Sequence, residues 1–247
     1  MKQNYLSKSF DVTTSCVDAN NVATCKYLLQ ICQDVAVLHA DHLGYGWKDL
    51  ASCNTLWVVS KVAVQVHTPV MLNDVVTVTT WPVVPNRFVA DRHYQIHNGN
   101  GQLVAEAISR WCIIDYTTRK MVNPKDVSQR FYDGDYLDKT CGAQFEGQKI
   151  VLDDTFSESY SRQIRWSDLD LNRHVNNTKY ADFAVDCLDE KTLDGTYAGK
   201  FEVTYHGECH LGDMLKLYSS LKDGHHRVLG QKDGANCFTF VADYKKL

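Results

Sequence analysis

Residues 22–38 read VATCKYLLQICQDVAVL, and the rest of the chain is arranged around them. The large apolar side chains of this stretch recur at the three- and four-residue spacing of one face of an α-helix: Tyr27, Leu28, Ile31, Cys32, Val35 and Leu38. Small or apolar residues fill much of the remaining surface. Because a helix that is apolar on most sides is a buried helix, the sequence predicts a central helix over about residues 22–39.

Strand patterns follow this helix. Val62, Val64 and Val66 alternate with polar residues, and Val76 and Val78 alternate with threonines, which is the period of a β-strand. The segments RFVADRHYQIH and QLVAEAISRWCIIDY flank the turn sequence NGNG and predict a long β-hairpin. The first half is therefore expected to be one buried helix followed by antiparallel strands.

The second half repeats this plan. Residues 160–166 are strand-like, and residues 176–188 predict an amphipathic helix, because their apolar positions form one stripe. Four further strand segments follow, KFEVTYHGE, DMLKLYSSL, HRVLGQ and NCFTFVADY.

The two halves also align residue by residue. A shift of 153 residues matches Lys26 with Lys179, and a shift of 139 matches Val64 with Val203 and Asp74 with Asp213, which indicates a duplicated unit. One helix wrapped by an antiparallel sheet, twice over, predicts an α+β tandem (double) hotdog with units at residues 1–140 and 155–247. The polar, glycine-containing segment YDGDYLDKTCGAQFEGQK joins them. The two sheets should pair side by side, so that the chain is a monomer resembling a dimer, with further homodimerisation possible.

Composition excludes several classes of protein. The 247 residues carry a net charge of -4, whereas a nucleic-acid-binding protein needs a basic surface. No apolar run has the length of a membrane span, and the first ten residues do not resemble a signal peptide. The nine cysteines are scattered without a CxxC pair, as in a reducing compartment. We therefore expect a soluble cytoplasmic protein.

The segment DLDLNRHVNN, residues 168–177, is the strongest candidate site. Asp168, Asp170, Asn172 and His174 share one parity, so an extended chain would turn a carboxylate, an amide and an imidazole the same way. A surface loop capped by its Asp and Asn residues is the alternative. The first copy has Ala19, Asn20 and Asn21 where the shift of 153 places Asn172, Arg173 and His174. The first copy is expected to have the same fold without this set of polar residues. Function is therefore the better explanation for their presence in the second copy.

A second candidate lies in YHGECHLGD, residues 205–213. Glu208 and Cys209 match Pro69 and Val70 of the first copy, and could supply a general base or a nucleophile. Alternation along the strand puts Cys209 on the apolar side and Glu208 opposite, although a bulge at Gly207 would reverse this. A buried cysteine is usually inert, which favours Glu208.

Other motifs predict less. The HADH segment, with His39, Asp41 and His42, offers no third metal ligand, and DGHHR has the composition of an exposed hairpin turn. The chain has no glycine-rich phosphate loop and no GxSxG elbow. We therefore expect neither a cofactor nor a metal.

SDLDLNRHVNNTKY resembles the signature loop of the acyl-acyl carrier protein (acyl-ACP) thioesterases, and YHGECHLGD resembles that family's second active-site segment. LWVVSKVAVQV, DVVTVTTW and AEAISRWCIID are also similar to the family, so the resemblance covers nearly the whole chain. It implies a double hotdog, hydrolysis of fatty acyl-ACP, and catalytic roles for Asp170, Asn172, His174 and Glu208. It also implies an acyl tunnel in the first half, lined by the helix from Cys25 to Leu38. The short chain favours a bacterial, cytoplasmic member.

The preferred mechanism is direct hydrolysis, in which Glu208 activates a water that Asn172 and His174 orient. Asp170 would hold the loop or the histidine, and N–H groups of the helix that follows would help to stabilise the oxyanion. Cys209 activated by His174 is the alternative. An acyl-CoA thioesterase and a non-catalytic acyl-binding hotdog remain alternative functions. Acyl carrier proteins are acidic, so docking needs a basic patch near the site, for which the candidates are Arg162, Arg165, Arg173 and Lys179.

Overall fold

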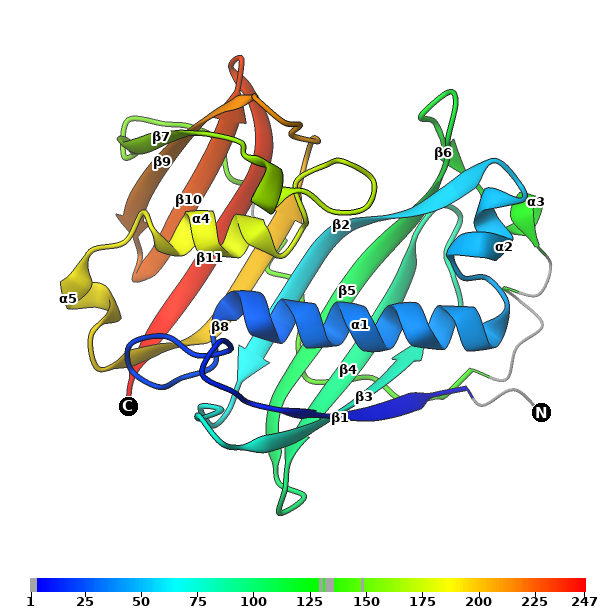
Figure 1. Ribbon diagram of the computed structural model, residues 1–247, viewed down its shortest axis with the longest axis horizontal. Helices are drawn as coiled ribbons and strands as arrows, with labels where there is room; N and C mark the ends of the chain where they lie inside the picture. Colours follow the sequence, from blue (N-terminus) through cyan, green and yellow to red (C-terminus); the bar gives the residue numbers. More distant parts are fainter. Residues whose placement is uncertain (1–3, 129–130, 132–135, 148) are drawn as a thin grey trace.

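The computed structural model describes residues 4–128, 131, 136–147 and 149–247. Its described strands form one antiparallel sheet in the order β1-β3-β4-β5-β2-β8-β11-β10-β9-β7, with the short β6 beside β5 (Figure 1). The first half supplies β1 (Leu6–Asp11), β2 (Thr55–Val66), β3 (Val75–Pro82), β4 (Ala90–Asn98), β5 (Leu103–Asp115) and β6 (Met121–Val122). The second half supplies β7 (Ser157–Gln163), β8 (Thr196–Tyr205), β9 (Met214–Lys222), β10 (His225–Lys232) and β11 (Ala235–Lys246).

The strand order reads the same from both ends. Apart from β6, the five strands of each half follow one sequence outward from the central pair, β2 and β8. In that pair Ala63 lies opposite Glu202, and Val62 and Val64 lie opposite Val203 and Phe201. The shift of 139 relates Ala63 to Glu202 and exchanges the two flanking pairs, which is the self-complementary pattern of a twofold interface. The predicted side-by-side pairing of the two units is confirmed.

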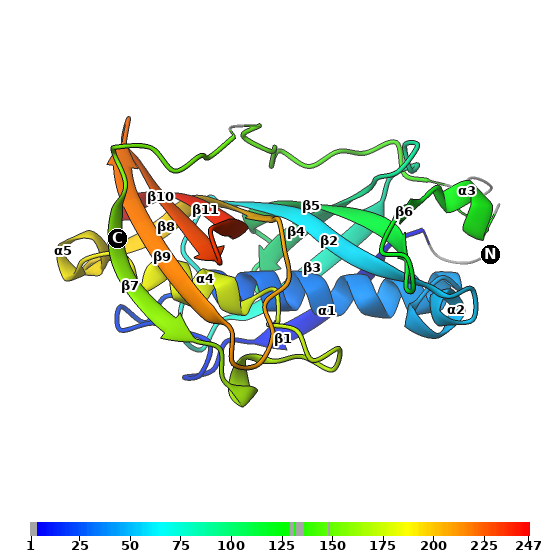
Figure 2. The same ribbon diagram turned by 90° about the horizontal axis from the view of Figure 1, so that it is seen from above.

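Two helices, α1 (Cys25–Leu43) and α4 (Lys179–Val185), cover one face of the sheet, as Figures 1 and 2 show. The other helices are α2 (Trp47–Ala51), α3 (Pro124–Val127) and α5 (Glu190–Leu193). The two central helices α1 and α4 are joined by an ion pair of 3.0 Å between Lys26 and Asp182. The protein is thus an α+β double hotdog, as predicted. None of the described helices is both long and apolar enough to cross a bilayer.

The end signals of α1 explain its bounds. The Thr24 hydroxyl accepts a hydrogen bond from the backbone N–H of Tyr27, and Gly44 ends the helix with a φ of 82°, which glycine adopts without strain. The helix therefore runs four residues beyond the predicted end. Its C-terminal part is less buried than expected, since Val37 and Leu38 are 47% and 37% exposed.

The predicted second helix is shorter than expected. It begins at Lys179 rather than Asn176, and a break after Val185 separates it from α5. The Asn176 side chain explains the late start, because its Oδ1 accepts from both the N–H and the hydroxyl of Thr178. This Asx turn precedes the helix instead of capping its first residue.

The connection between the halves crosses the face of the sheet opposite α1 and α4 (Figure 2). Trp81 Nε1 donates to the Lys139 carbonyl over 2.7 Å, and Cys141 and Ala143 pack against Ala63 and Trp81. Four residues of the predicted linker, 132–135, and residue 148 lie outside the described residues. The described part is anchored to the sheet rather than solvated.

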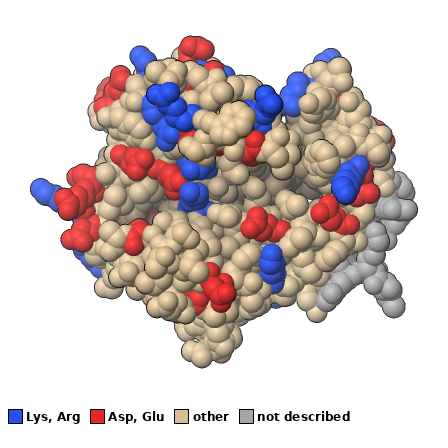
Figure 3. Space-filling model, in the orientation of Figure 1, with Lys and Arg blue, Asp and Glu red and all other residues tan. Residues whose placement is uncertain are grey.

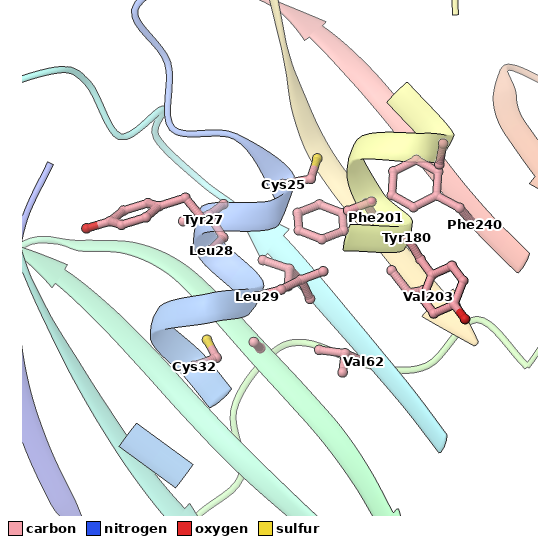
Figure 4. Close-up of a cluster of buried hydrophobic side chains, with 14 of the residues drawn as sticks. Cys25, Tyr27, Leu28, Leu29, Cys32, Val62, Tyr180, Phe201, Val203 and Phe240 are labelled. Carbon is pink, nitrogen blue, oxygen red and sulfur yellow. The ribbon is translucent and has the colours of Figure 1, made fainter. Parts of the chain in front are cut away.

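The core is continuous across the joint between the halves. Figure 4 shows Phe201 of β8 facing side chains of α1 and α4, including Cys25, Leu29 and Tyr180. Phe201 is buried, and its ring stacks on Phe240 at a centroid separation of 6.0 Å. A single cluster of buried side chains thus contains residues of both helices and both halves of the sheet.

Phe201→Ala should lower the free energy of unfolding by about 3–5 kcal/mol, because it opens a cavity where the two units share one core. Leu221→Ala, at a position 64% exposed, is the matched control and should change stability by less than about 0.5 kcal/mol. Urea unfolding measures both. Equal effects of the two substitutions would contradict a shared core.

Candidate active site

The loop at residues 169–175 is a tight hairpin rather than an extended strand. Leu169 and Val175 form an isolated bridge, and the Asp170 carboxylate accepts from the N–H groups of Asn172 (2.8 Å) and His174 (3.3 Å). Arg173 turns the chain with a φ of 63°. The extended-chain parity argument was therefore wrong, although the hairpin still places Asp170, Asn172 and His174 around one cavity.

Asp168 does not join this group. It is buried, and its carboxylate accepts from Arg162 Nη2 at 2.7 Å and from the backbone N–H of Arg165 at 2.8 Å. The Arg162 guanidinium also lies 3.8 Å from the ring centroid of Phe183. Asp168 and Arg162 therefore brace the start of the loop.

The first half contains the same hairpin. Val17 and Ala23 form the matching bridge, the Asp18 carboxylate accepts from the N–H groups of Asn20 (2.8 Å) and Val22 (3.1 Å), and Asn21 has a φ of 61°. The shift within the loop is thus 152, one less than the shift that aligns Lys26 with Lys179. Asp18 corresponds to Asp170, Asn20 to Asn172 and Val22 to His174.

This corrects the sequence comparison. The fold uses the aspartate in both halves to hold the loop, so Asp170 is not peculiar to the candidate site. A second bridge is also shared, between Val22 and Met71 in the first half and between His174 and His210 in the second. The residues that distinguish the second half are His174, Glu208 and His210, where the first half has Val22, Pro69 and Met71.

Glu208 and His174 meet at the cavity. The His174 Nδ1 atom lies 3.5 Å from Glu208 Oε1, and the same oxygen is paired with Arg119 Nη2. Arg119 comes from the turn that follows β5, so the carboxylate is held by both halves of the protein. Sequence reasoning missed Arg119, because it lies 89 residues before its partner and in no motif.

A cavity of about 1060 Å³ extends from this cluster into the first half. Figure 3 shows the corresponding hollow near the middle of this face. The sequence-predicted residues Asp170, Asn172, His174 and Glu208 all line it, together with apolar residues of the first half that include Ala36, Val37, Leu56, Trp57, Val83 and Phe131. A cavity with polar side chains at one end and apolar walls beyond them can hold an acyl chain, with the carbonyl group of that chain beside the polar side chains.

The matching position of the other half is nearly closed. A pocket of about 60 Å³ is lined there by Asp18, Val22, Leu193 and Thr196. By the shift of 139, Leu193 and Thr196 correspond to Asn54 and Trp57, which line the large cavity. Asn20 closes it by donating from Nδ2 to the carbonyls of Leu193 (2.7 Å) and Thr196 (3.1 Å). Of two related positions, only the one with His174 and Glu208 is open.

Cys209 faces the core instead of the cavity. It is fully buried, and it is not among the described residues that line the cavity. A hydrogen bond with the Cys237 thiol lowers the pKa of Cys209 to about 7, against the effect of burial. A nucleophile must also reach its substrate, so the position of Cys209 argues against the alternative mechanism. Strand alternation had left the sides of Glu208 and Cys209 open, and both residues follow the end of β8 at Tyr205.

Several backbone N–H groups just before and at the start of α4 already have acceptors. Those of Val175 and Asn176 donate to the Cys209 and Asp168 carbonyls, and that of Lys179 donates to the Asn176 carbonyl. These particular N–H groups are therefore not free to stabilise an oxyanion. The side chains of Asn172 and Asn177 line the cavity and remain candidate donors.

The HADH segment lies near the end of α1, and its His39 contacts Arg92, a residue of the cavity wall. Arg92 lines the cavity while almost fully buried, and its Nη1 donates to His39 Nδ1 (2.9 Å) and to Thr80 Oγ1 (3.3 Å). Burial lowers the pKa of Arg92. Since the guanidinium can only donate, His39 accepts as a neutral ring. Arg92 thus places a buried cation in the cavity wall, in addition to Arg119 and Arg173, which also line the cavity.

Comparison with known proteins agrees with this architecture. Residues 3–131 match the family model for the acyl-ACP thioesterase N-terminal domain, and residues 152–238 match that for the C-terminal domain. A chloroplastic palmitoyl-acyl carrier protein thioesterase of Gossypium hirsutum is 25% identical over 227 residues, which cover 88% of this chain and 55% of the relative. The chain spans about half the length of such curated relatives.

Two solved structures share the fold over nearly their full length. An acyl-ACP thioesterase from Bacteroides thetaiotaomicron superposes with a TM-score of 0.89 at 23% identity, covering 98% of both chains. The 12:0-ACP thioesterase from Umbellularia californica gives 0.86 at 18% identity, covering 100% of this chain and 99% of the other. Fold and site define a double hotdog in which, of the two related positions, the one beside His174 and Glu208 opens into a large cavity. The chain belongs to the acyl-ACP thioesterase family.

Asp18→Ala and Asp170→Ala should destabilise the protein to a similar extent, by about 0.5–2 kcal/mol each, because each removes a carboxylate that caps two N–H groups of the same hairpin. Urea unfolding of the two variants tests this. A large effect at only one position would show that the two loops are not held alike.

Proposed function

We propose that this protein hydrolyses the thioester of fatty acyl-ACP and releases the free fatty acid, which ends chain elongation. The observation that supports it most is the asymmetry of the two related positions: the open cavity is the one bordered by His174 and Glu208. Membership of the acyl-ACP thioesterase family supports the same substrate class.

In the proposed reaction Glu208 removes a proton from a water molecule, and the water oxygen attacks the thioester carbonyl carbon. The tetrahedral intermediate then collapses, the carbon–sulfur bond breaks, and the leaving thiolate takes up the proton. His174, with its Nδ1 atom 3.5 Å from Glu208 Oε1, orients the water or the carbonyl. Asn172 donates to the developing oxyanion.

Two further residues support this group. Asp170 fixes the hairpin through the N–H groups of Asn172 and His174 and so positions both side chains. Arg119 holds the Glu208 carboxylate from the opposite half. We assign both residues a positioning role, in which they act through Glu208, Asn172 and His174.

The division of labour follows the predicted domains. Residues 1–140 would form the hotdog that holds the acyl chain, and residues 155–247 the hotdog that carries the catalytic residues. The substrate would be met in the cytoplasm by a monomer, since the pairing of β2 with β8 already supplies the contact that two single hotdogs would form. Acyl-CoA hydrolysis and acyl binding without turnover are the outcomes that would replace this proposal.

Glu208→Gln and His174→Ala should each lower kcat by about 10²–10⁴-fold, because each removes a group that acts on the attacking water. Cys209→Ala should keep most of the activity, since the thiol lies in the core. Release of free thiol from an acyl-ACP substrate measures turnover, and circular dichroism verifies folding. Loss of turnover in Cys209→Ala with normal Glu208→Gln activity would favour the cysteine mechanism.

The carrier would meet a mixed surface. Figure 3 shows Lys and Arg as well as Asp and Glu side chains around the hollow. Of the predicted basic patch, Arg165 and Arg173 are exposed, whereas Arg162 is engaged with Asp168. We therefore propose Arg165 and Arg173, beside the hairpin, as the residues that attract an acidic carrier protein.

Arg165→Glu and Arg173→Glu should each raise KM for acyl-ACP by about two- to fivefold with little change in kcat, as expected for exposed ion pairs. The effect should fade as salt rises, since the screening length is about 8 Å at physiological ionic strength. Lys222→Glu is the control, because it reverses the charge of an exposed lysine at the C-terminal end of β9, away from the hairpin. Equal kcat/KM on acyl-CoA and acyl-ACP at low salt would contradict the choice of carrier.

A further inference from the structure

Three side chains with metal-binding atoms meet beside the cavity. His174, Glu208 and His210 each offer one ligand atom, and these atoms all lie within 4.8 Å of one another. The backbone explains why they meet: His174 and His210 are opposite each other in an isolated antiparallel bridge, and Glu208 precedes His210 by two residues. The two imidazole rings lie edge to face with centroids 4.8 Å apart.

The fold does not require these residues. In the related bridge of the first half the same positions hold Val22, Pro69 and Met71, none of which is a usual ligand of a divalent transition ion, and the bridge still forms. Hydrolysis accounts for His174 and Glu208, but the proposed reaction makes no use of His210. A second histidine at this point therefore calls for another explanation.

We propose that His174, Glu208 and His210 form a binding site for one divalent transition-metal ion, with Zn²⁺ as the best fit. Two imidazoles and one carboxylate with a fourth position open is an established zinc ligand set. Imidazole nitrogens disfavour Mg²⁺ and Ca²⁺, which prefer oxygen ligands. Sequence analysis expected no metal, and this set escaped it because no short motif contains both His174 and His210.

The distances suit a small ion. Zinc–ligand distances of about 2.0–2.2 Å place neighbouring donor atoms of a tetrahedral site roughly 3.4 Å apart. The separation of 3.5 Å between His174 Nδ1 and Glu208 Oε1 already meets this value. The side chains of His174, Glu208 and His210 are 28%, 38% and 51% exposed, so an ion can enter from solvent and small ring rotations can close the set.

Surrounding residues would tune the affinity in opposite directions. The Asp213 carboxylate accepts from the backbone N–H of His210 at 2.8 Å and lies 3.7 Å from the ring atom Nδ1, which is where an outer carboxylate commonly orients a ligating histidine. Lys232 holds that carboxylate at 2.9 Å. Arg119 instead competes with the ion, because it is paired with the oxygen of Glu208 nearest to His174.

Occupancy of the site would suppress hydrolysis. An ion bound by Glu208 and His174 occupies their lone pairs. Glu208 could then no longer accept a proton from the attacking water, and His174 could no longer orient that water. This consequence rests on the proposed function, whereas the binding site does not.

The test begins with the full-length protein carrying Cys53→Ser, which removes the exposed thiol, after treatment with a chelator and removal of the chelator. Calorimetric titration with ZnCl₂ should give one ion per chain. Co²⁺ should give the visible absorption of a four-coordinate site without the near-ultraviolet band of a thiolate ligand. His210→Ala should weaken Zn²⁺ binding by at least about tenfold, and Arg119→Gln should strengthen it. His42→Ala, at an exposed histidine on α1, should change nothing.

Activity measurements separate the two proposals. Zn²⁺ should inhibit acyl-ACP hydrolysis reversibly, and His210→Ala should keep the metal-free rate while losing the inhibition. Zn²⁺ binding that is absent, or unchanged in His210→Ala, overturns the site whatever the enzyme does. Binding without inhibition overturns the regulatory consequence. Binding that depends on His210 in a protein that cleaves no acyl thioester leaves the site standing and overturns the proposed function.

Discussion

The antiparallel pairing of β2 with β8 is the constraint on which the other features depend. Hydrogen bonding across Ala63 and Glu202 joins two hotdog sheets into one and sets the two halves about a local twofold. Lys61 and the buried Glu202 reinforce the joint with an ion pair of 2.9 Å. Because of this arrangement, the hairpin of each half lies near the start of the central strand of the other half. The open cavity lies between one such hairpin and the start of β2, and the small pocket between the other hairpin and the start of β8.

The two halves share one scaffold but differ at the related pocket positions. Both hairpins keep the aspartate that caps two N–H groups, and both keep the bridge to the strand segment opposite. In the first half Asn20 closes its pocket with hydrogen bonds to the other half, whereas its counterpart Asn172 borders an open cavity. Residues of α1 and α2 form part of the wall of that cavity.

The polar cluster at the cavity requires both halves to be in place. Glu208 and His174 come from the second half, and Arg119, which is paired with Glu208, comes from the first. Glu208 and His174 lie close enough to act on one water molecule in the proposed reaction. Together with His210 they also form a set of candidate metal ligands. Access of an ion and access of a substrate to this point are therefore linked by geometry.

The sequence by itself determined the fold class, the duplication and the segments that form the site, because these depend on the periodicity of apolar residues and on local motifs. It could not settle the sides of Glu208 and Cys209, which lie beyond the end of β8. It could not assign Asp168, whose carboxylate is buried against Arg162, or show that Asp170 has a counterpart in Asp18, since the shift changes by one residue between loop and helix. Arg119, the His210 contact and the closure of one of two related pockets were decided only by the tertiary structure. Each depends on atoms brought together across the twofold joint, and no local pattern records distances between segments so far apart in the chain.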